Sequence, residues 1–68
     1  MRFKVDTALL IDNEYFLKGE KIEIQLEEDG SEYVGFLRDF SESQISVEVD
    51  GELKQYSDDE ISGIYKLK

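Results

Sequence analysis

The stretch from Ile22 to Phe40, IEIQLEEDGSEYVGFLRDF, constrains the fold of this chain more than any other segment. Apolar and polar residues alternate on both sides of Asp29-Gly30, and alternation with a period of two is typical of strands. An Asp-Gly pair favours a two-residue type I′ turn, because both turn positions require positive φ. Such a turn places Leu26 opposite Tyr33 and fixes every other pair by counting. The pattern therefore predicts a β-hairpin of defined register.

Further turn signals recur about every ten residues, a spacing that is typical of short strands in a small barrel or sandwich. They lie at Lys18-Gly19, Asp29-Gly30, Ser41–Ser43, Asp50-Gly51 and Ser57–Asp59. The chain has 68 residues, no proline, no internal repeat and no low-complexity linker. We therefore expect residues 1–68 to form one small domain.

The N-terminal segment, residues 1–19, allows two interpretations. Its alternating apolar residues and a plausible turn at Asp12-Asn13 favour extended structure. Alternatively, Asp6 caps a short helix that ends at Lys18-Gly19. We expect strand rather than helix.

The third strand of the core, residues 44–49, is followed by a hairpin whose register the sequence leaves open. A two-residue Asp50-Gly51 loop places Glu52 opposite Val49. A three-residue loop with a bulge places Leu53 there instead. Each register buries one large residue and exposes another.

Ser57-Asp58-Asp59-Glu60 matches a capping box, in which Ser57 and Glu60 satisfy each other's backbone donors. Only a single helical turn fits before Ile61, where the last strand begins. Five strands with one short helical turn before the last are the layout of an SH3-like barrel. We therefore expect an all-β fold, a small and strongly bent five-stranded antiparallel barrel.

Residues 20–68 resemble the Sm-like branch of SH3-like barrels. The likeness rests on an apolar strand, a Gly turn, a Gly-x-Leu-x-x-Phe motif and an alternating strand: Ile22–Leu26, Asp29-Gly30, Gly35, Leu37, Phe40 and Ile45–Val49. Gly35 would suit the bent second strand of such barrels. The resemblance implies an RNA-binding ring, in which the fourth and fifth strands of neighbouring subunits join.

Three departures from the family pattern bear on RNA binding. Ser41 stands where the motif continues with Asp, and the base-contacting position falls near Gln44 rather than Asn. The segment Tyr56–Glu60 carries three carboxylates where the family has cations for uridine and phosphate. A polyanion needs cations there. The expected partners therefore do not include nucleic acid.

Composition excludes several kinds of chemistry. The chain has no cysteine and no histidine, so it lacks disulfides, thiolate metal sites, thiol nucleophiles and imidazole catalysis. Its net charge is −9, and residues 22–53 hold ten acids and one base, Arg38. We expect no catalytic residues, cofactor, metal, small-molecule substrate or membrane contact, and a cytoplasmic location. A small barrel has little room for a ligand pocket, so we do not expect an enzyme.

Two candidate surfaces follow from these patterns. Val34 and Phe36 point away from Ile22, Ile24 and Leu26 in the hairpin and mark a possible interface, joined by the strand edge with Tyr56, Ile61 and Ile64. A possible acidic partner patch consists of Glu27, Glu28, Glu32, Asp39 and Glu48. The leading hypothesis is a non-enzymatic protein-interaction or assembly module, which associates with itself or with a basic partner. The alternatives are an Sm-like RNA-binding ring protein and an acidic decoy that imitates nucleic acid.

Overall fold

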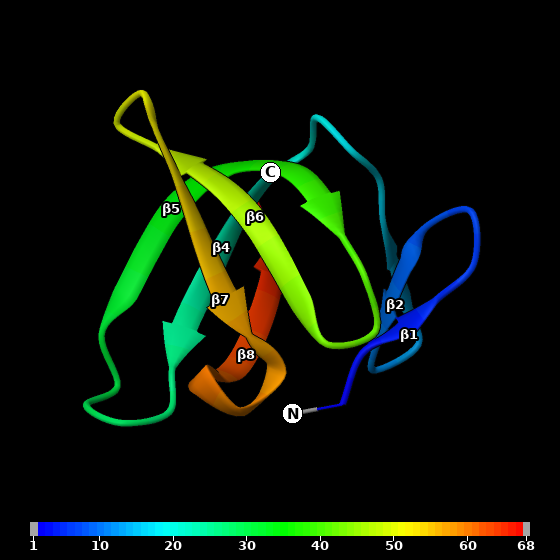
Figure 1. The fold of residues 1–68 in the computed structure, drawn as a ribbon, viewed down its shortest axis with the longest axis horizontal. Coiled ribbons are helices and arrows are strands. Elements are labelled where there is room, and N and C mark those ends of the chain that lie inside the picture. The colour runs from blue at the N-terminus through cyan, green and yellow to red at the C-terminus, as the bar shows by residue number, and fades with distance from the viewer. Residues whose placement is uncertain (1, 68) are drawn as a thin grey trace.

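The computed structural model describes residues 2–67, which form two antiparallel sheets (Figure 1). The first sheet has the order β1-β2-β3 and consists of β1 (Lys4–Val5), β2 (Leu9–Ile11) and β3 (Glu14–Phe16). The second has the order β7-β6-β5-β4-β8 and consists of β4 (Lys21–Leu26), β5 (Glu32–Phe40), β6 (Gln44–Val49), β7 (Glu52–Ser57) and β8 (Ile61–Lys66). A 3₁₀ turn, η1 (Asp58–Glu60), separates β7 from β8. The prediction of an all-β fold is confirmed.

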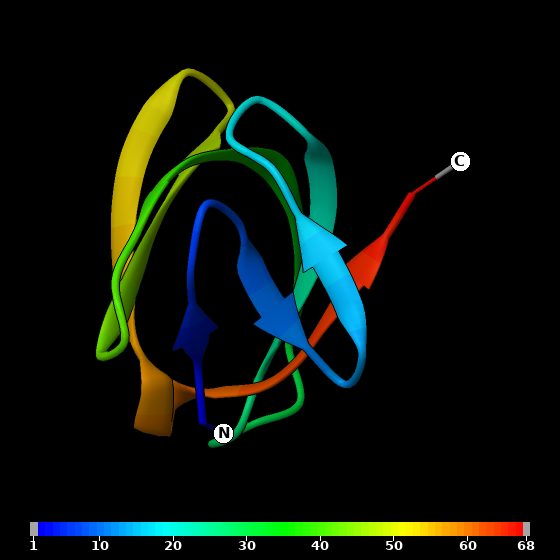
Figure 2. The same cartoon turned by 90° about the vertical axis from the view of Figure 1, so that its right-hand side faces the viewer.

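The N-terminal segment is extended, as expected, and the helical alternative is wrong. It forms three short strands in a meander, which lies in front of the strongly curved five-stranded sheet in Figure 2. Asp12 and Asn13 form the turn between β2 and β3, with φ of 48° and 68°. Their positive φ values fit a two-residue loop between the paired residues Ile11 and Glu14.

The β4–β5 hairpin has a different register from the one predicted. Tyr33 pairs with Ile24 rather than Leu26, and the loop comprises the four residues Glu27–Gly30. The backbone N–H of Ser31 donates to the Asp29 side chain at 3.0 Å, and among the loop residues only Gly30 has a positive φ. The Glu27 backbone N–H donates to the Glu60 carbonyl oxygen at 2.8 Å. This N–H is therefore bonded to η1 and does not pair with β5, as it would in a longer hairpin. Because the shift is two residues, each side chain keeps its predicted face.

The β6–β7 hairpin adopts the two-residue loop. Val49 pairs with Glu52, while Asp50 and Gly51 have φ of 51° and 80°. This register buries Tyr56 and leaves Leu53 exposed. A type I′ turn matches the right-handed twist of the flanking strands, which explains why it is preferred to a bulged loop.

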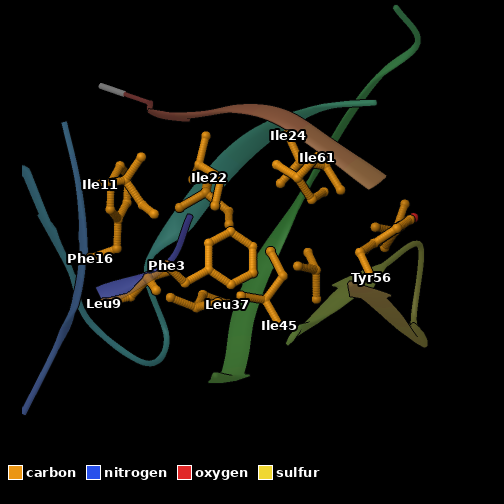
Figure 3. Packing of buried hydrophobic residues seen from close by; sticks show 13 residues of the cluster. Phe3, Leu9, Ile11, Phe16, Ile22, Ile24, Leu37, Ile45, Tyr56 and Ile61 are labelled. Atoms are coloured by element: carbon orange, nitrogen blue, oxygen red, sulfur yellow. The ribbon is translucent and has the colours of Figure 1, made fainter. Parts of the chain in front are cut away.

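One cluster of buried side chains joins the two sheets (Figure 3). Phe3, Leu9, Ile11 and Phe16 come from the N-terminal segment. The other members come from the five-stranded sheet: Ile22, Ile24, Leu37, Ile45, Val47, Val49, Tyr56, Ile61 and Ile64. The three-stranded sheet therefore completes the core, because its inward side chains cover apolar surface that the five-stranded sheet would leave in water.

The capping box at the start of η1 is present. The Ser57 backbone N–H donates to a carboxylate oxygen of Glu60 at 2.9 Å, and the Ser57 hydroxyl donates to the same oxygen at 3.0 Å. These hydrogen bonds hold the pKa of Glu60 below its usual value. Within residues 2–67, no helix has the length and apolar character needed to cross a membrane.

Candidate interaction surface

The outer face of the five-stranded sheet, the side that points away from the buried cluster, carries four exposed large apolar side chains. Their exposed fractions are 42% for Val34, 40% for Phe36, 62% for Leu53 and 47% for Tyr65. Cross-strand partners share a face of a sheet. One row across this face is Lys21, Phe36, Glu48 and Leu53, and the next is Tyr65, Glu23 and Val34. Apolar and charged side chains therefore alternate across the surface.

A shallow hollow of about 350 Å³ lies on this face. Its lining residues are Lys21, Val34, Gly35, Phe36, Glu48, Asp50 and Gly51. Val34 and Phe36 are two residues apart on β5 and therefore share the outer face, where both line the hollow. Its volume is at the lower end of the range for small-ligand sites.

An ion pair fixes one side of the hollow. The Arg38 Nε donates to a carboxylate oxygen of Glu48 at 2.9 Å, and the Arg38 guanidinium lies 5.3 Å from the centre of the Phe36 ring. Arg38 occupies the position where the register between β5 and β6 shifts, between Leu37 and Asp39. Its side chain lies on the outer face, two residues beyond Phe36, where it contacts both Phe36 and Glu48.

Glu23 and Glu32 form a like-charge pair beside the apolar residues. Glu23 lies opposite Val34, and Glu32 lies opposite Gln25, so the two carboxylates are diagonal neighbours on β4 and β5. Partial burial raises the pKa of Glu23, and so do hydrogen bonding and charge repulsion with Glu32. The ionised form of Glu23 is therefore less favourable in the folded protein than in the unfolded chain.

Replacement of Glu23 by Gln is expected to stabilise the fold at pH 7. A raised carboxyl pKa means that folding becomes less favourable as the pH rises through it, and Gln removes this penalty. The stabilisation should shrink as the pH falls toward and below 4.5, the usual pKa, because wild-type Glu23 then carries its proton. Urea midpoints measured between pH 7 and pH 4 test this expectation, with Glu42→Gln in an exposed loop as control. A gain that is independent of pH would contradict it.

The predicted interface residues separate into two groups. Val34 and Phe36 lie on the outer face, as expected. The side chains of Tyr56, Ile61 and Ile64 lie in the core instead, so they do not line a surface. Ile61 and Ile64 both point inward because the register between β4 and β8 shifts at Gln25/Leu26. β7 and β8 are the two end strands of the sheet order. The predicted edge therefore consists of their outer backbone N–H and C=O groups, which pair with no other strand of residues 2–67.

The predicted acidic patch is also divided. Asp39 forms an ion pair with Lys18 at 3.3 Å, and Glu48 pairs with Arg38. Backbone hydrogen bonding from Phe40, together with Lys18, lowers the pKa of Asp39. Glu32 belongs to the pair with Glu23 described above. The five carboxylates thus have three different environments.

Glu27 and Glu28 meet η1 rather than the rest of the predicted patch. With Leu26, Asp59 and Glu60 they line a hollow of about 240 Å³. The two loops lie side by side at the bottom of Figure 1, joined by the hydrogen bond from Glu27 to Glu60. Sequence patterns do not bring these segments together, because the contact depends on the pairing of β4 with β8.

Two residues of the outer face were missed by the sequence analysis. Leu53 follows from the two-residue Asp50-Gly51 loop, one of the two registers left open. Tyr65 follows from the alternation of β8 once Ile64 is placed inward. Both signals were in the sequence, but each depended on a register that only the complete sheet determines.

The positions singled out by the Sm-like resemblance carry no cationic side chain. Gln44 is exposed and lines a polar hollow of about 80 Å³ with Asp39, Phe40, Ser41, Ser46 and Gln55. Asp58, Asp59 and Glu60 form η1. Within residues 2–67, no group of three or more acidic side chains is arranged to hold a metal ion.

Comparisons of the chain with protein-family models, with curated proteins and with solved structures find no match.

Proposed function

We propose that this chain is a non-enzymatic protein-interaction module whose contact surface is the outer face of the five-stranded sheet. The observation that carries the proposal is the group of exposed apolar side chains Val34, Phe36, Leu53 and Tyr65, which lie on the outer face of three strands, β5, β7 and β8, with a hollow beside Val34 and Phe36. Apolar residues gathered on one face, rimmed by charges, are typical of protein-binding sites. Aromatic side chains contribute much of the binding energy at such sites.

The rigidity of the sheet supports the same function. Val34, Phe36 and Tyr65 stand on β5 and β8, whose opposite sides place Leu37, Ile61 and Ile64 in the core, so a partner meets a supported surface there. Arg38 further restrains Phe36 and Glu48. Binding to an ordered surface loses less conformational entropy than binding to a flexible loop.

Polar replacement of the outer face tests the proposal. The double variant Phe36→Ser/Leu53→Ser should fold, because both side chains are exposed, and should no longer capture a partner. Tyr15→Ser/Leu17→Ser removes exposed apolar residues from the N-terminal part and serves as the matched control. Chemical crosslinking of a tagged chain in cells that encode it, followed by mass spectrometry, compares the captured proteins. Equal capture by both variants would refute the proposal.

We further propose that residues 20–68 form an SH3-like barrel of the Sm-like type. Support comes from the order β7-β6-β5-β4-β8, which sets the last strand beside the first strand of this sheet, and from the single turn before β8. The curvature of β5 in Figure 1 and the close approach of Gly35 to Glu48 agree with the bent second strand expected there. An experimental structure showing a flat, open sheet would overturn this assignment.

An Sm-like ring that binds RNA is the second candidate, favoured by the position of β7 and β8 at the two ends of the sheet order, where no strand of residues 2–67 pairs with their outer edges. Sedimentation at several concentrations tests the ring, and an RNA titration at low salt tests binding. We expect no RNA affinity, because carboxylates stand at η1 where the phosphate would need cations. The third candidate, an acidic mimic of nucleic acid, has less support, since Asp39 and Glu48 are already paired with cations.

A further inference from the structure

The Glu23–Glu32 pair lies within the outer face, and within residues 2–67 no ion pair joins either carboxylate to a lysine or an arginine. The groups around Glu23 on this face are Lys21 and Gln25 on β4, Glu32 and Val34 on β5, and Tyr65 on β8. Like charges at such positions lower the stability of a sheet. The free protein therefore retains a repulsion beside its exposed apolar side chains.

We propose that the outer face binds a cationic, extended segment of another protein, whose Lys or Arg side chain lies between Glu23 and Glu32. This inference rests on the proposed function and specifies the chemistry of the partner. Apolar side chains next to that cation would cover Val34 and Tyr65 and enter the hollow beside Phe36. An extended segment suits this surface, because every second side chain of a strand points to the same side, so Lys or Arg and apolar residues in turn at those positions would meet the acidic and apolar side chains of the face.

Charge complementarity distinguishes this occupant from a second copy of the chain. Each copy carries a net charge of −9, so two outer faces would bring their carboxylates together. A cationic segment instead gives the Glu23–Glu32 pair an ion-pair partner, which residues 2–67 do not provide. Electrostatic complementarity of this kind contributes to specificity and to the association rate.

The proposal predicts that affinity rises with pH. A bound cation favours the ionised forms of Glu23 and Glu32, so binding should strengthen as the pH rises through the range in which Glu23 loses its proton. The other residues that face Glu23 on this surface are Lys21, Gln25, Val34 and Tyr65, and none of them carries a carboxyl group. The pH dependence should therefore come from the carboxylate pair.

Two synthetic peptides serve as probes of the full-length chain. The first, Leu-Ser-Lys-Ser-Leu-Ser-Lys, places Leu and Lys in turn on one side of an extended chain, and the second has Glu in place of each Lys. In ¹H–¹⁵N spectra, the Lys peptide should shift the amides of β4, β5 and β8 near Glu23, and the Glu peptide should not bind. Glu23→Gln/Glu32→Gln should weaken the Lys peptide about fivefold. Glu27→Gln/Glu28→Gln makes the same charge change in the β4–β5 loop and should leave its affinity unchanged.

Three results would overturn the inference: equal binding of both peptides, equal weakening by both double variants, or shifts confined to residues 27–30 and 58–60. The last two would indicate attraction to the overall negative charge. If Phe36→Ser/Leu53→Ser abolishes partner capture while the Lys peptide does not bind the outer face, the proposed function stands and the cationic partner is wrong. If capture is unaffected as well, the proposed function fails with it.

Discussion

Gly35→Ala is expected to lower the free energy of unfolding by about 3 kcal/mol, as overpacking of a filled core does. A Cβ at this position would meet the backbone carbonyl oxygen of Glu48, and would lie 2.8 Å from Val47 Cγ1 and 3.0 Å from Val49 Cγ2. Because the closest neighbour is backbone in the paired strand β6, relief of the clash must move β6 away from β5. The whole stability of a domain of this size is roughly 3–10 kcal/mol, so the variant should be partly unfolded.

Gly63→Ala provides the matched control for this effect. Gly63 is also a buried strand glycine, but the three atoms nearest to a Cβ there all belong to the side chain of Tyr65, which is exposed and can rotate away. Urea unfolding followed by circular dichroism should show a large loss for Gly35→Ala and a small one for Gly63→Ala. Equal midpoints for the two variants would mean that β5 and β6 tolerate separation at this point.

Local patterns in the sequence were sufficient for the elements that depend on neighbouring residues. Alternation located the strands of the hairpins, and the capping box located η1. Asp12-Asn13 and Asp50-Gly51 both form turns with positive φ, as their residue types indicate. In each case the residues that determine the structure lie within a few positions of one another. A local pattern in the sequence is therefore enough to predict it.

The errors came from interactions between distant segments. Asp29-Gly30 does not form the predicted two-residue loop, and the Glu27 N–H next to it donates to the carbonyl oxygen of Glu60, which lies far away in the sequence. Ile61 and Ile64 were placed at an edge, but the register shift between β4 and β8 directs both into the core. A single sequence does not indicate such a shift, because it arises from the curvature of the complete sheet.

The candidate surface shows the same division. Val34 and Phe36 were placed on the outer face because a register error of two residues leaves the faces unchanged. Leu53 and Tyr65 can be assigned to the same face only from the full strand order β7-β6-β5-β4-β8 and its registers. The ion pair between Asp39 and Lys18 likewise could not be predicted, because the two residues come from different segments of the chain.

The N-terminal sheet contributes Phe16 to the buried cluster that it shares with the five-stranded sheet. Phe16→Ala should lower the free energy of unfolding by about 3–5 kcal/mol, the usual range for deletion of a buried phenylalanine ring. The Phe16 side chain is 0% exposed and belongs to the same buried cluster as Ile22 and Leu37 (Figure 3). The Lys66 ammonium lies 5.3 Å from the centre of its ring, so the substitution also removes a contact with β8.

Tyr15→Ala is the control, since Tyr15 is 59% exposed on the other side of β3 and should change stability little. Amide signals from both sheets, followed through urea unfolding of Phe16→Ala, should disappear at the same midpoint. This is expected because one cluster connects the sheets, so the cavity destabilises residues 2–19 and the five-stranded sheet together. If only the three-stranded sheet were lost, the N-terminal segment would be an appendage to a self-sufficient core of residues 20–68. The burial of Phe3, Leu9 and Ile11 beside Phe16 argues for a single folding unit instead.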